Sequence, residues 1–325
     1  TLPWLRDRAT HGDVRVAAVQ AIATGWRDDP ATLPLLHDRA THDTDGYVRQ
    51  VAVWTIATGW RDDPATLPLL HDRATHDTHR AVRVVAVQAI ADGWRDDPAA
   101  LPILHDRATH DTHREVRQAA VQAIATGWHD DPATLPWLHD RATHDTDEAV
   151  RRVAVEAIAT GWRDDPATLP WLRDRATHDT HGYVRQAAVQ AIATGWRDDP
   201  ATLPWLRDRA THDTHGDVRQ VAVWTIADGW RDDPATLPLL HDRATHDTHG
   251  DVRQVAVQAI ATGWRDDPAT LPLLHDRATH DDYWAVRRAA VQAIATGWRD
   301  DPATLPWLRD RATHDTHGDV RVAAV

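Results

Sequence analysis

The chain has 325 residues, of which 42% are hydrophobic and 26% are charged, as is ordinary for a soluble protein. Cys is absent, which excludes disulfides and thiolate metal sites. The formal net charge is -13, which argues against a nucleic-acid partner because phosphate binding needs clustered cations. No apolar run approaches the roughly 20 residues that span a bilayer, and no signal-peptide pattern opens the chain. We therefore expect a cytoplasmic protein without membrane contacts.

The dominant feature of the sequence is internal repetition. The segment that begins at Thr32 with TLPLLHDRATHDTDGYVRQ begins again at Thr66, which gives a period of 34 residues. Further copies begin at Ala100, Thr134, Thr168, Thr202, Thr236 and Thr270. A shorter copy opens the chain at Thr1, and a partial copy begins at Thr304 and stops at Val325 inside a predicted helix. Because solenoids usually close with polar capping repeats, we expect a fragment of a longer chain with further domains.

Each copy predicts two helices. Asp63 and Pro64 resemble an N-cap and a first helical position, followed by Leu67, Leu70 and Ala74 at the spacing of one helical face. The position of Pro68 also allows the regular helix to begin nearer Thr66. The turn THDTDG leads to a second helix over residues 48–57, with Gly59 predicted as a left-handed C-cap.

The second helix carries an apolar stripe that one copy cannot bury alone. The stripe consists of Val48, Val51, Ala52, Thr55 and Ile56. Its burial, at roughly 1.5 to 3 kcal/mol for each sizeable side chain, cannot offset an ordering cost of about 1 to 2 kcal/mol per residue. Stacking of copies supplies the difference. The prediction is an all-α, right-handed solenoid that forms a single domain over residues 1–325.

A turn Asp six residues before an Arg recurs in the copies, for example Asp43 with Arg49 and Asp213 with Arg219, next to the core motif VRxxAVxAI. This pattern resembles HEAT repeats, and the resemblance covers the whole chain. It implies a ladder in which Asp and Arg connect adjacent turns. The first copy lacks the Asp before Arg15, which puts that rung in question.

The joint motif ATGWRDDPATLPLLHDRA is similar to the HEAT arrays on the C-terminal side of bacterial NACHT-type (STAND) signalling NTPases. This resemblance implies a sensor arm. No GxxxxGK[ST] motif is present, so the NTPase itself does not lie in this sequence.

The copies differ from one another mainly along one stripe of the second helix. In the second copy these positions are Tyr47, Gln50, Trp54 and Thr58, at spacings of i, i+3, i+7 and i+11. At about 100° per residue they lie opposite the packing face and are expected to face solvent on the concave side of the solenoid. Neutral drift of exposed positions is the alternative, but Trp, Tyr and Arg are common anchors of interfaces.

The predicted partner-binding residues on this stripe are Tyr47, Gln50, Trp54, Gln88, Asp92, Glu115, Gln122, Arg152, Glu156, Tyr183, Gln190, Asp217, Trp224, Asp228, Asp251, Gln258, Arg288 and Gln292. The ninth copy adds Tyr283 and Trp284 in its turn, as a contact loop at the rim or as neutral substitutions. Because acidic residues outnumber Arg on the stripe, we expect a protein or peptide partner of basic or mixed charge.

Other recurring groups favour structural roles. The HxxH pairs, such as His76 and His79, recur without a third ligand, and the second His becomes Asp45 or Tyr283 elsewhere, which argues against a metal site. Paired Asp residues such as Asp62 and Asp63 precede Pro and suit helix capping rather than acid-base catalysis. Trp60 and its equivalents are expected to pack between repeats, with a ligand-stacking ladder as the alternative.

These patterns predict a non-catalytic binding scaffold without a cofactor or metal. Two other functions remain open at this point. One is a purely architectural spacer. The other is a nucleic-acid repair enzyme similar to the HEAT-like alkylpurine glycosylases, which would need a basic concave surface.

Overall fold

The computed structural model describes residues 14–325, and this part of the chain is all-helical, with no strand. The predicted all-α solenoid of two-helix repeats is confirmed. The chain divides into two compact units, Thr1–Trp162 and Arg163–Val325. The first helix expected near Thr1 lies outside the described residues. The single continuous array stays a prediction.

In the first unit, each complete repeat contributes a first and a second helix. The first helices are α3 (Thr32–His42), α5 (Thr66–His76), α7 (Ala100–His110) and α9 (Thr134–His144). The second helices are α2 (Arg15–Gly25), α4 (Gly46–Gly59), α6 (Arg80–Gly93), α8 (Arg114–Gly127) and α10 (Glu148–Gly161).

The second unit repeats this order. Its first helices are α11 (Thr168–His178), α13 (Thr202–His212), α15 (Thr236–His246), α17 (Thr270–His280) and α19 (Thr304–His314). Its second helices are α12 (Gly182–Gly195), α14 (Gly216–Gly229), α16 (Gly250–Gly263), α18 (Trp284–Gly297) and α20 (Gly318–Ala323). None of the helices in the described part combines the length and the hydrophobicity that crossing a bilayer requires.

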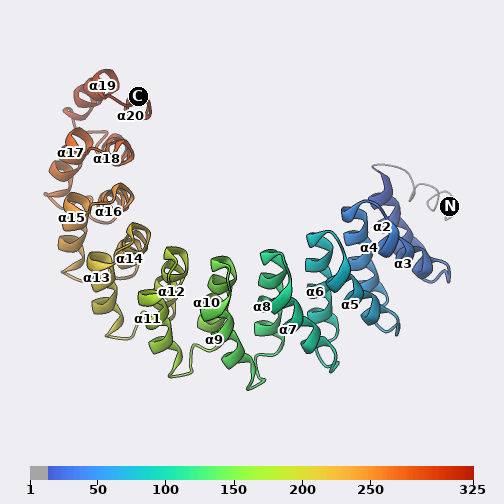
Figure 1. The fold of residues 1–325 in the computed structure, drawn as a ribbon. Coiled ribbons are helices and arrows are strands. Elements are labelled where there is room, and N and C mark those ends of the chain that lie inside the picture. The colour runs from blue at the N-terminus through green and yellow to red at the C-terminus, as the bar shows by residue number, and fades with distance from the viewer. Residues whose placement is uncertain (1–13) are drawn as a thin grey trace. The chain divides into compact units, whose positions relative to one another are not determined.

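Within each unit the helices form two layers (Figure 1). The backbones of successive second helices lie close together over much of their length, whereas the backbones of successive first helices come close at only a few positions. The second-helix layer is therefore the more closely spaced of the two. Closer spacing on one side curves a stack toward that side, so within each unit the second helices occupy the inner layer.

The core of a repeat is a wide face of the second helix packed on a narrow stripe of the first. Val48, Ala52 and Ile56 are buried, as the periodicity predicts, and Leu70 and Ala74 of α5 are fully buried. Val53 is also fully buried, although the predicted stripe omits it. The second helix contacts its own first helix and both neighbouring second helices, so its buried face is wider than that of a helix with one partner.

The first helix begins at the later of the two starts that the sequence allows. Asp63 and Pro64 lie in a turn, and α5 begins at Thr66. The Asp63 side chain accepts a hydrogen bond from the Ala65 N–H at 2.9 Å, and the buried Thr66 hydroxyl donates to the Trp60 carbonyl at 2.7 Å. The predicted N-cap is therefore wrong in position, because Asp63 caps a turn that precedes the helix.

The predicted left-handed cap at Gly59 is also wrong. Gly59 is the last residue of α4, and Trp60 follows it with φ -131° and ψ 44°. The Trp60 N–H still donates to the Ile56 carbonyl at 2.9 Å. The chain thus leaves the helix without a positive φ, and a Cβ on Gly59 would have no neighbour within 4 Å.

At several joints, a glycine at the start of the second helix lies against the turn of the following repeat. A Cβ on Gly46 would lie 2.5 Å from the ring of His79, which belongs to the turn of the following repeat. Gly216 stands in the same relation to His249, and Gly250 to Tyr283. At these joints the following turn lies directly on the helix start, so a larger residue there would require the ring to move.

A ladder of buried ion pairs joins neighbouring repeats. Arg49 donates from Nε and Nη2 to the Asp77 carboxylate of the following repeat at 2.8 and 2.7 Å. Its third bond, from Nη1 to the Asp43 carbonyl at 2.7 Å, holds its own turn. The predicted ladder is confirmed within each unit. The rung of the first copy also forms. Arg15 donates to Asp43 of the second copy at 2.9 Å, so this ion pair does not require an Asp in the first copy.

The ladder holds its carboxylates ionised. Burial alone would raise the pKa of Asp77, but hydrogen bonds from Arg49 and from the His79 N–H bring that pKa below its ordinary value. The same balance lowers the pKa of Asp247 beside Arg219 and of Asp315 beside Arg287. The rungs at Asp77, Asp247 and Asp315 are therefore charged at neutral pH, and breaking one would strand a buried charge.

The joint tryptophans pack between repeats, as predicted. The Arg27 guanidinium lies 5.9 Å from the ring centroid of Trp60 and donates to the Gly59 carbonyl. Arg197 and Arg231 repeat this contact on Trp230 and Trp264. At these joints a cation of the preceding repeat covers one face of the ring, which leaves less room for the alternative of a ligand-stacking ladder.

Candidate functional site

In the first unit, the candidate surface lies on α4, α6, α8 and α10. Trp54 on α4 is 51% exposed and Tyr47 is 58% exposed, although both side chains are large and aromatic. The other predicted residues that are exposed on these helices are Gln88, Asp92, Gln122 and Glu156. Gln50, Glu115 and Arg152 are partly covered. The packing of successive second helices brings these side chains onto one side of the unit.

The second unit presents the corresponding surface on α12, α14, α16 and α18. Trp224 on α14 is 48% exposed, and Tyr183 on α12 is 62% exposed. The other exposed members are Asp228, Gln258 and Gln292. Gln190, Asp217, Asp251 and Arg288 are partly covered. None of the predicted partner-binding residues in either unit is buried.

Some charged residues of this surface form ion pairs within the protein, and others do not. Arg152 and Glu156 form an ion pair at 2.7 Å on α10, and Glu115 lies 3.9 Å from Arg80. Asp92, Asp217 and Asp228 form no ion pair within residues 14–325. The charge that stays available to a partner on this surface is therefore mainly negative.

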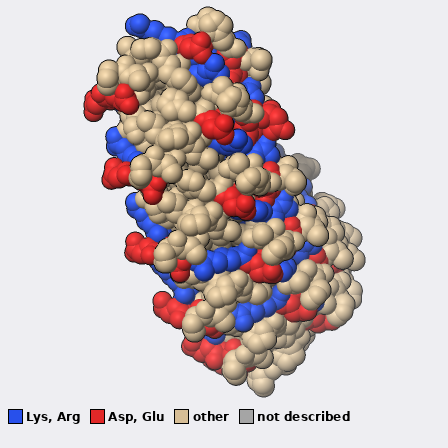
Figure 2. Space-filling view, turned by 90° about the vertical axis from the view of Figure 1, so that its left-hand side faces the viewer, with Lys and Arg blue, Asp and Glu red and all other residues tan. Residues whose placement is uncertain are grey.

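A different pattern covers the side of the molecule drawn in Figure 2. There, acidic and basic side chains lie next to one another, and no patch of one sign covers the face. Adjacent residues of the first helices pair with each other, as Asp208 does with Arg209 and Asp242 with Arg243. The first-helix surface is thus largely self-neutralised.

The predicted contact loop of the ninth copy is occupied by its own neighbours. Trp284 stacks on His317, with ring centroids 4.3 Å apart and planes at 10°. The Arg288 guanidinium lies 5.3 Å from the Trp284 ring, and the nearby Asp251 carboxylate raises the pKa of the Tyr283 hydroxyl. These residues are partly covered. These contacts connect the turn to the adjacent repeats. Trp284 therefore offers a partner less exposed surface than Trp54 or Trp224 does.

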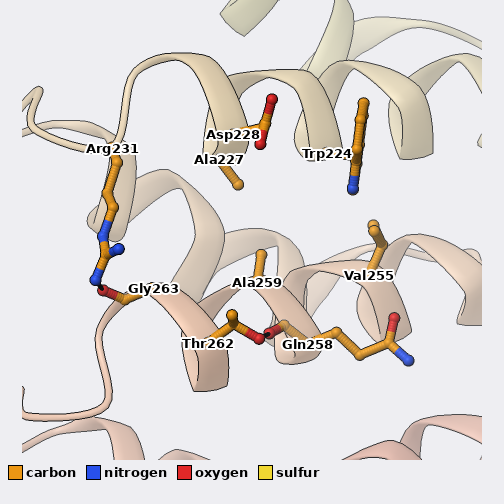
Figure 3. Close-up of a pocket in the computed structure, with 9 residues that line it drawn as sticks. All are labelled: Trp224, Ala227, Asp228, Arg231, Val255, Gln258, Ala259, Thr262 and Gly263. Atoms are coloured by element: carbon orange, nitrogen blue, oxygen red, sulfur yellow. Dashed lines mark hydrogen bonds between the residues drawn. The ribbon is translucent and has the colours of Figure 1, made fainter.

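A groove opens between α14 and α16 (Figure 3). Its volume is about 320 Å³. Trp224 and Asp228 project into it from α14, Val255 and Gln258 from α16, and Ala227 and Ala259 line its floor. Arg231 closes one end by donating to the Gly263 carbonyl. The groove brings together three predicted residues, Trp224, Asp228 and Gln258.

Val255 is a groove residue that the sequence analysis missed. Its equivalent Val51 is assigned to the packing stripe, but Val255 is only partly covered and lines the groove. The copies do carry a signal, because this position alternates between valine and alanine, as in Val85 and Ala119. Variation at a position predicted to pack indicates that it also reaches the surface.

The recurring histidines have different roles at the two positions of each HxxH pair. His76 Nδ1 lies 3.0 Å from Asp72 Oδ1 on the same helix, whereas His79 belongs to the turn above Gly46. The described residues contain no group of three or more side chains suited to hold a metal ion. In the Asp pairs, Asp63 caps its turn while Asp62 is exposed.

Other tryptophans, among them Trp137 and Trp307, lie on the first helices and pack within that layer. His105 of α7 meets Trp137 of α9 edge to face, with centroids 4.5 Å apart, and His275 meets Trp307 in the same way. Burial lowers the pKa of His105 and of His275, although Asp131 and Asp301 oppose the shift. These imidazoles therefore favour the neutral form in the folded protein.

Comparisons with known proteins agree with this architecture. The chain is similar to a solved structure of Kap95p, with 15% identity and a TM-score of 0.59, over 99% of this chain and 48% of that chain. It is similar to Kap121p, with 15% identity and a TM-score of 0.52, over 99% of this chain and 39% of that chain. The Escherichia coli protein YibA matches with 18% identity and a TM-score of 0.47, over 88% and 98% of the two chains.

The chain thus spans less than half the length of Kap95p and of Kap121p. Sequence identities of 15% show that the fold is shared and nothing more. No curated protein matches the sequence. The family model described as HEAT repeats matches residues 1–57, 42–125, 101–193, 191–261 and 256–325. Together with the two-helix repeats and the Arg–Asp ladder, this match shows that the chain belongs to the HEAT-repeat family.

Proposed function

We propose that the chain is a non-catalytic scaffold that binds a protein or peptide along its second helices. The observation that carries the proposal is the exposure of Trp54 and Trp224. Seven other copies hold Gln or Glu at this position, as in Gln88 and Glu156, so the repeat folds without an aromatic there. A large apolar side chain held in solvent by a rigid helix is a common anchor for a partner.

The charge of the surface indicates the kind of partner. Asp92, Asp217 and Asp228 have no ion pair within the described part of the chain, whereas Arg152 is neutralised by Glu156. A partner with basic or mixed charge would satisfy these carboxylates. The same surface repels phosphate groups, so we propose a protein partner rather than nucleic acid.

The structural neighbours support a binding role in general terms. Solved structures of Kap121p include complexes with Nup53p, with the SUMO protease Ulp1p and with RanGTP. Those partners belong to Kap121p. What supports the present proposal is that repeats of this architecture offer one long surface to other proteins.

Selection of peptides from a displayed random library on the immobilised chain tests the proposal. The selected peptides are then measured against a variant with Trp54→Gln, Trp224→Gln, Tyr47→Ala and Tyr183→Ala. Every replacement is a residue that another copy holds at the same position, as Gln88 and Ala81 do, so the fold is expected to survive. Loss of these four aromatic side chains should weaken binding by about tenfold or more.

Circular dichroism and urea unfolding of the variant serve as controls and should match the parent chain. If the selected peptides bind the parent and the variant equally, the second-helix surface is not the binding site. If no peptide is selected at all, the architectural spacer is the better description of the chain.

We further propose that this scaffold is the sensor arm of a larger signalling NTPase. The support is the resemblance of the ATGWRDDPATLP joint to arrays of that class. In the full-length protein, a peptide selected on this array should then change the rate of nucleotide hydrolysis. An unchanged rate at saturating peptide would remove the sensor role and leave the binding role in place.

A further inference from the structure

The groove between α14 and α16 combines an aromatic wall, an apolar floor and one free carboxylate. Trp224 is about half exposed, Ala227 and Ala259 line the floor, and Val255 faces Trp224 from the opposite helix (Figure 3). Asp228 follows Trp224 by four residues, so both side chains emerge on the same face of α14. An aromatic face beside a carboxylate attracts a cation through both groups.

The second charged residue of the groove does not neutralise the first. Arg231 donates to the Gly263 carbonyl, and its guanidinium lies 5.8 Å from the ring centroid of Trp264. It forms no ion pair with Asp228 within the described residues. The cation of Arg231 is therefore held at the joint, and the carboxylate of Asp228 stays open to a ligand.

We propose that this groove receives a single lysine or arginine side chain of the bound peptide, an inference that rests on the proposed function. The aliphatic stem lies over Ala227 and Ala259, and the cationic head lies between the Trp224 ring and the Asp228 carboxylate. The groove volume, about 320 Å³, leaves space for one long side chain.

The adjacent groove in the same unit is a natural control. It lies between α16 and α18, has a volume of about 400 Å³ and is lined by the equivalent residues. Gln258 stands in place of Trp224, Thr262 in place of Asp228, and Ala289 in place of Val255. The framework is the same, but the aromatic wall and the carboxylate are missing. This groove should therefore show no preference for a cation.

The test uses the peptide acetyl-Gly-Gly-Lys-Gly-Gly-amide and matched peptides with Arg, norleucine or Glu in place of Lys. Binding is followed by NMR on the indole N–H signal of Trp224, which is assigned by its loss in Trp224→Gln. We expect saturable shifts with the Lys and Arg peptides and at least fivefold weaker binding of the norleucine and Glu peptides. The Lys affinity should fall with added salt.

Substitutions then separate the two attractive groups. Asp228→Thr installs the residue that Thr262 provides in the control groove, and it should weaken Lys binding about three- to fivefold without changing norleucine binding. Trp224→Gln, observed through the backbone amides of α14, should weaken Lys binding by roughly tenfold. The converse variant, Gln258→Trp with Thr262→Asp, should create a second Lys-binding groove.

Equal binding of Lys and norleucine, or an unchanged Lys affinity in Asp228→Thr, would overturn the inference. If library-selected peptides still depend on the aromatic surface in that case, the proposed function stands and only the groove assignment fails. If the Lys peptide binds the groove but no selected peptide depends on the surface, the proposed function fails instead.

Discussion

Residues 50–78 and residues 220–248 are identical at every position but one, because Thr58 in the first segment stands where Asp228 stands in the second. Each segment carries an exposed tryptophan, Trp54 or Trp224, on a second helix. In the first unit, the acid at the position equivalent to Asp228 lies on the following second helix, as Asp92 of α6. The two regions therefore share a framework and differ in where the surface places its charge.

The framework contacts of the two regions agree closely. Arg49 meets Asp77 at 2.8 and 2.7 Å, and Arg219 meets Asp247 at 2.8 and 2.6 Å. A change of one surface residue leaves these rungs in place. The comparison teaches that stability and recognition are carried by separate side chains of the same helix, so each can be altered without the other.

The largest expected effect comes from breaking a rung. Arg49→Ala and Arg219→Ala should each lower the free energy of unfolding by about 3 to 5 kcal/mol, because a buried carboxylate loses its partner. Urea denaturation followed by circular dichroism measures this. Because the two rungs have the same geometry, the two losses should be equal. Losses below about 1 kcal/mol would mean that the ladder is screened by solvent and does not hold the repeats together.

Glycine substitutions should have opposite signs at the two ends of the same helix. Gly46→Ala and Gly216→Ala place a methyl group against His79 and His249, so each should cost about 1 to 3 kcal/mol in thermal or urea unfolding. Gly59→Ala meets no neighbour within 4 Å and should stabilise the protein by about 0.4 to 1 kcal/mol. A destabilised Gly59→Ala would contradict the backbone conformation described for this cap.

The smallest expected effect is a difference in pH dependence between α3 and α13, the first helices that precede the two regions. Burial lowers the pKa of His37, with Asp63 opposing the shift, whereas the equivalent Arg207 stays charged and pairs with Asp233. The fold favours neutral His37, so its contribution to stability should be lost as the pH falls from about 6.5 toward the lowered folded pKa. His37→Arg should reduce the dependence of unfolding stability on pH between pH 5 and 7, to which His105 and His275 also contribute. A dependence that persists unchanged in urea unfolding would exclude His37 as one of its sources.

The ladder acts in a lower pH range and equally in both regions. The pKa values of Asp77 and Asp247 are lowered in the fold, so the stability that these carboxylates contribute is present above about pH 3.9 and is lost as the pH falls through the folded values. Acid titration of unfolding stability therefore offers an internal standard against which the His37 effect can be compared.

Periodicity was sufficient to predict the two helices and the solvent exposure of the variable stripe, because each repeat presents the same pattern to a near-identical neighbour. The Arg–Asp ladder followed from the resemblance to HEAT repeats. Periodicity failed at Val53 and Val255, whose environments depend on two neighbouring second helices at once. It also gave no sign that Trp284 stacks on His317 of the following repeat. In these cases the partner comes from another repeat and leaves no periodic signal.

By itself, the amino-acid sequence determined that the chain is a HEAT-repeat array and which positions vary along it, since near-identical copies must bury the same face. Only the tertiary structure decided what the glycines do and which charges remain free. Gly46 makes room for the next turn, while Gly59 leaves its helix without a left-handed residue. Glu156 is neutralised by Arg152, whereas Asp228 stays open beside Trp224. These outcomes depend on distances between repeats, which no single copy contains.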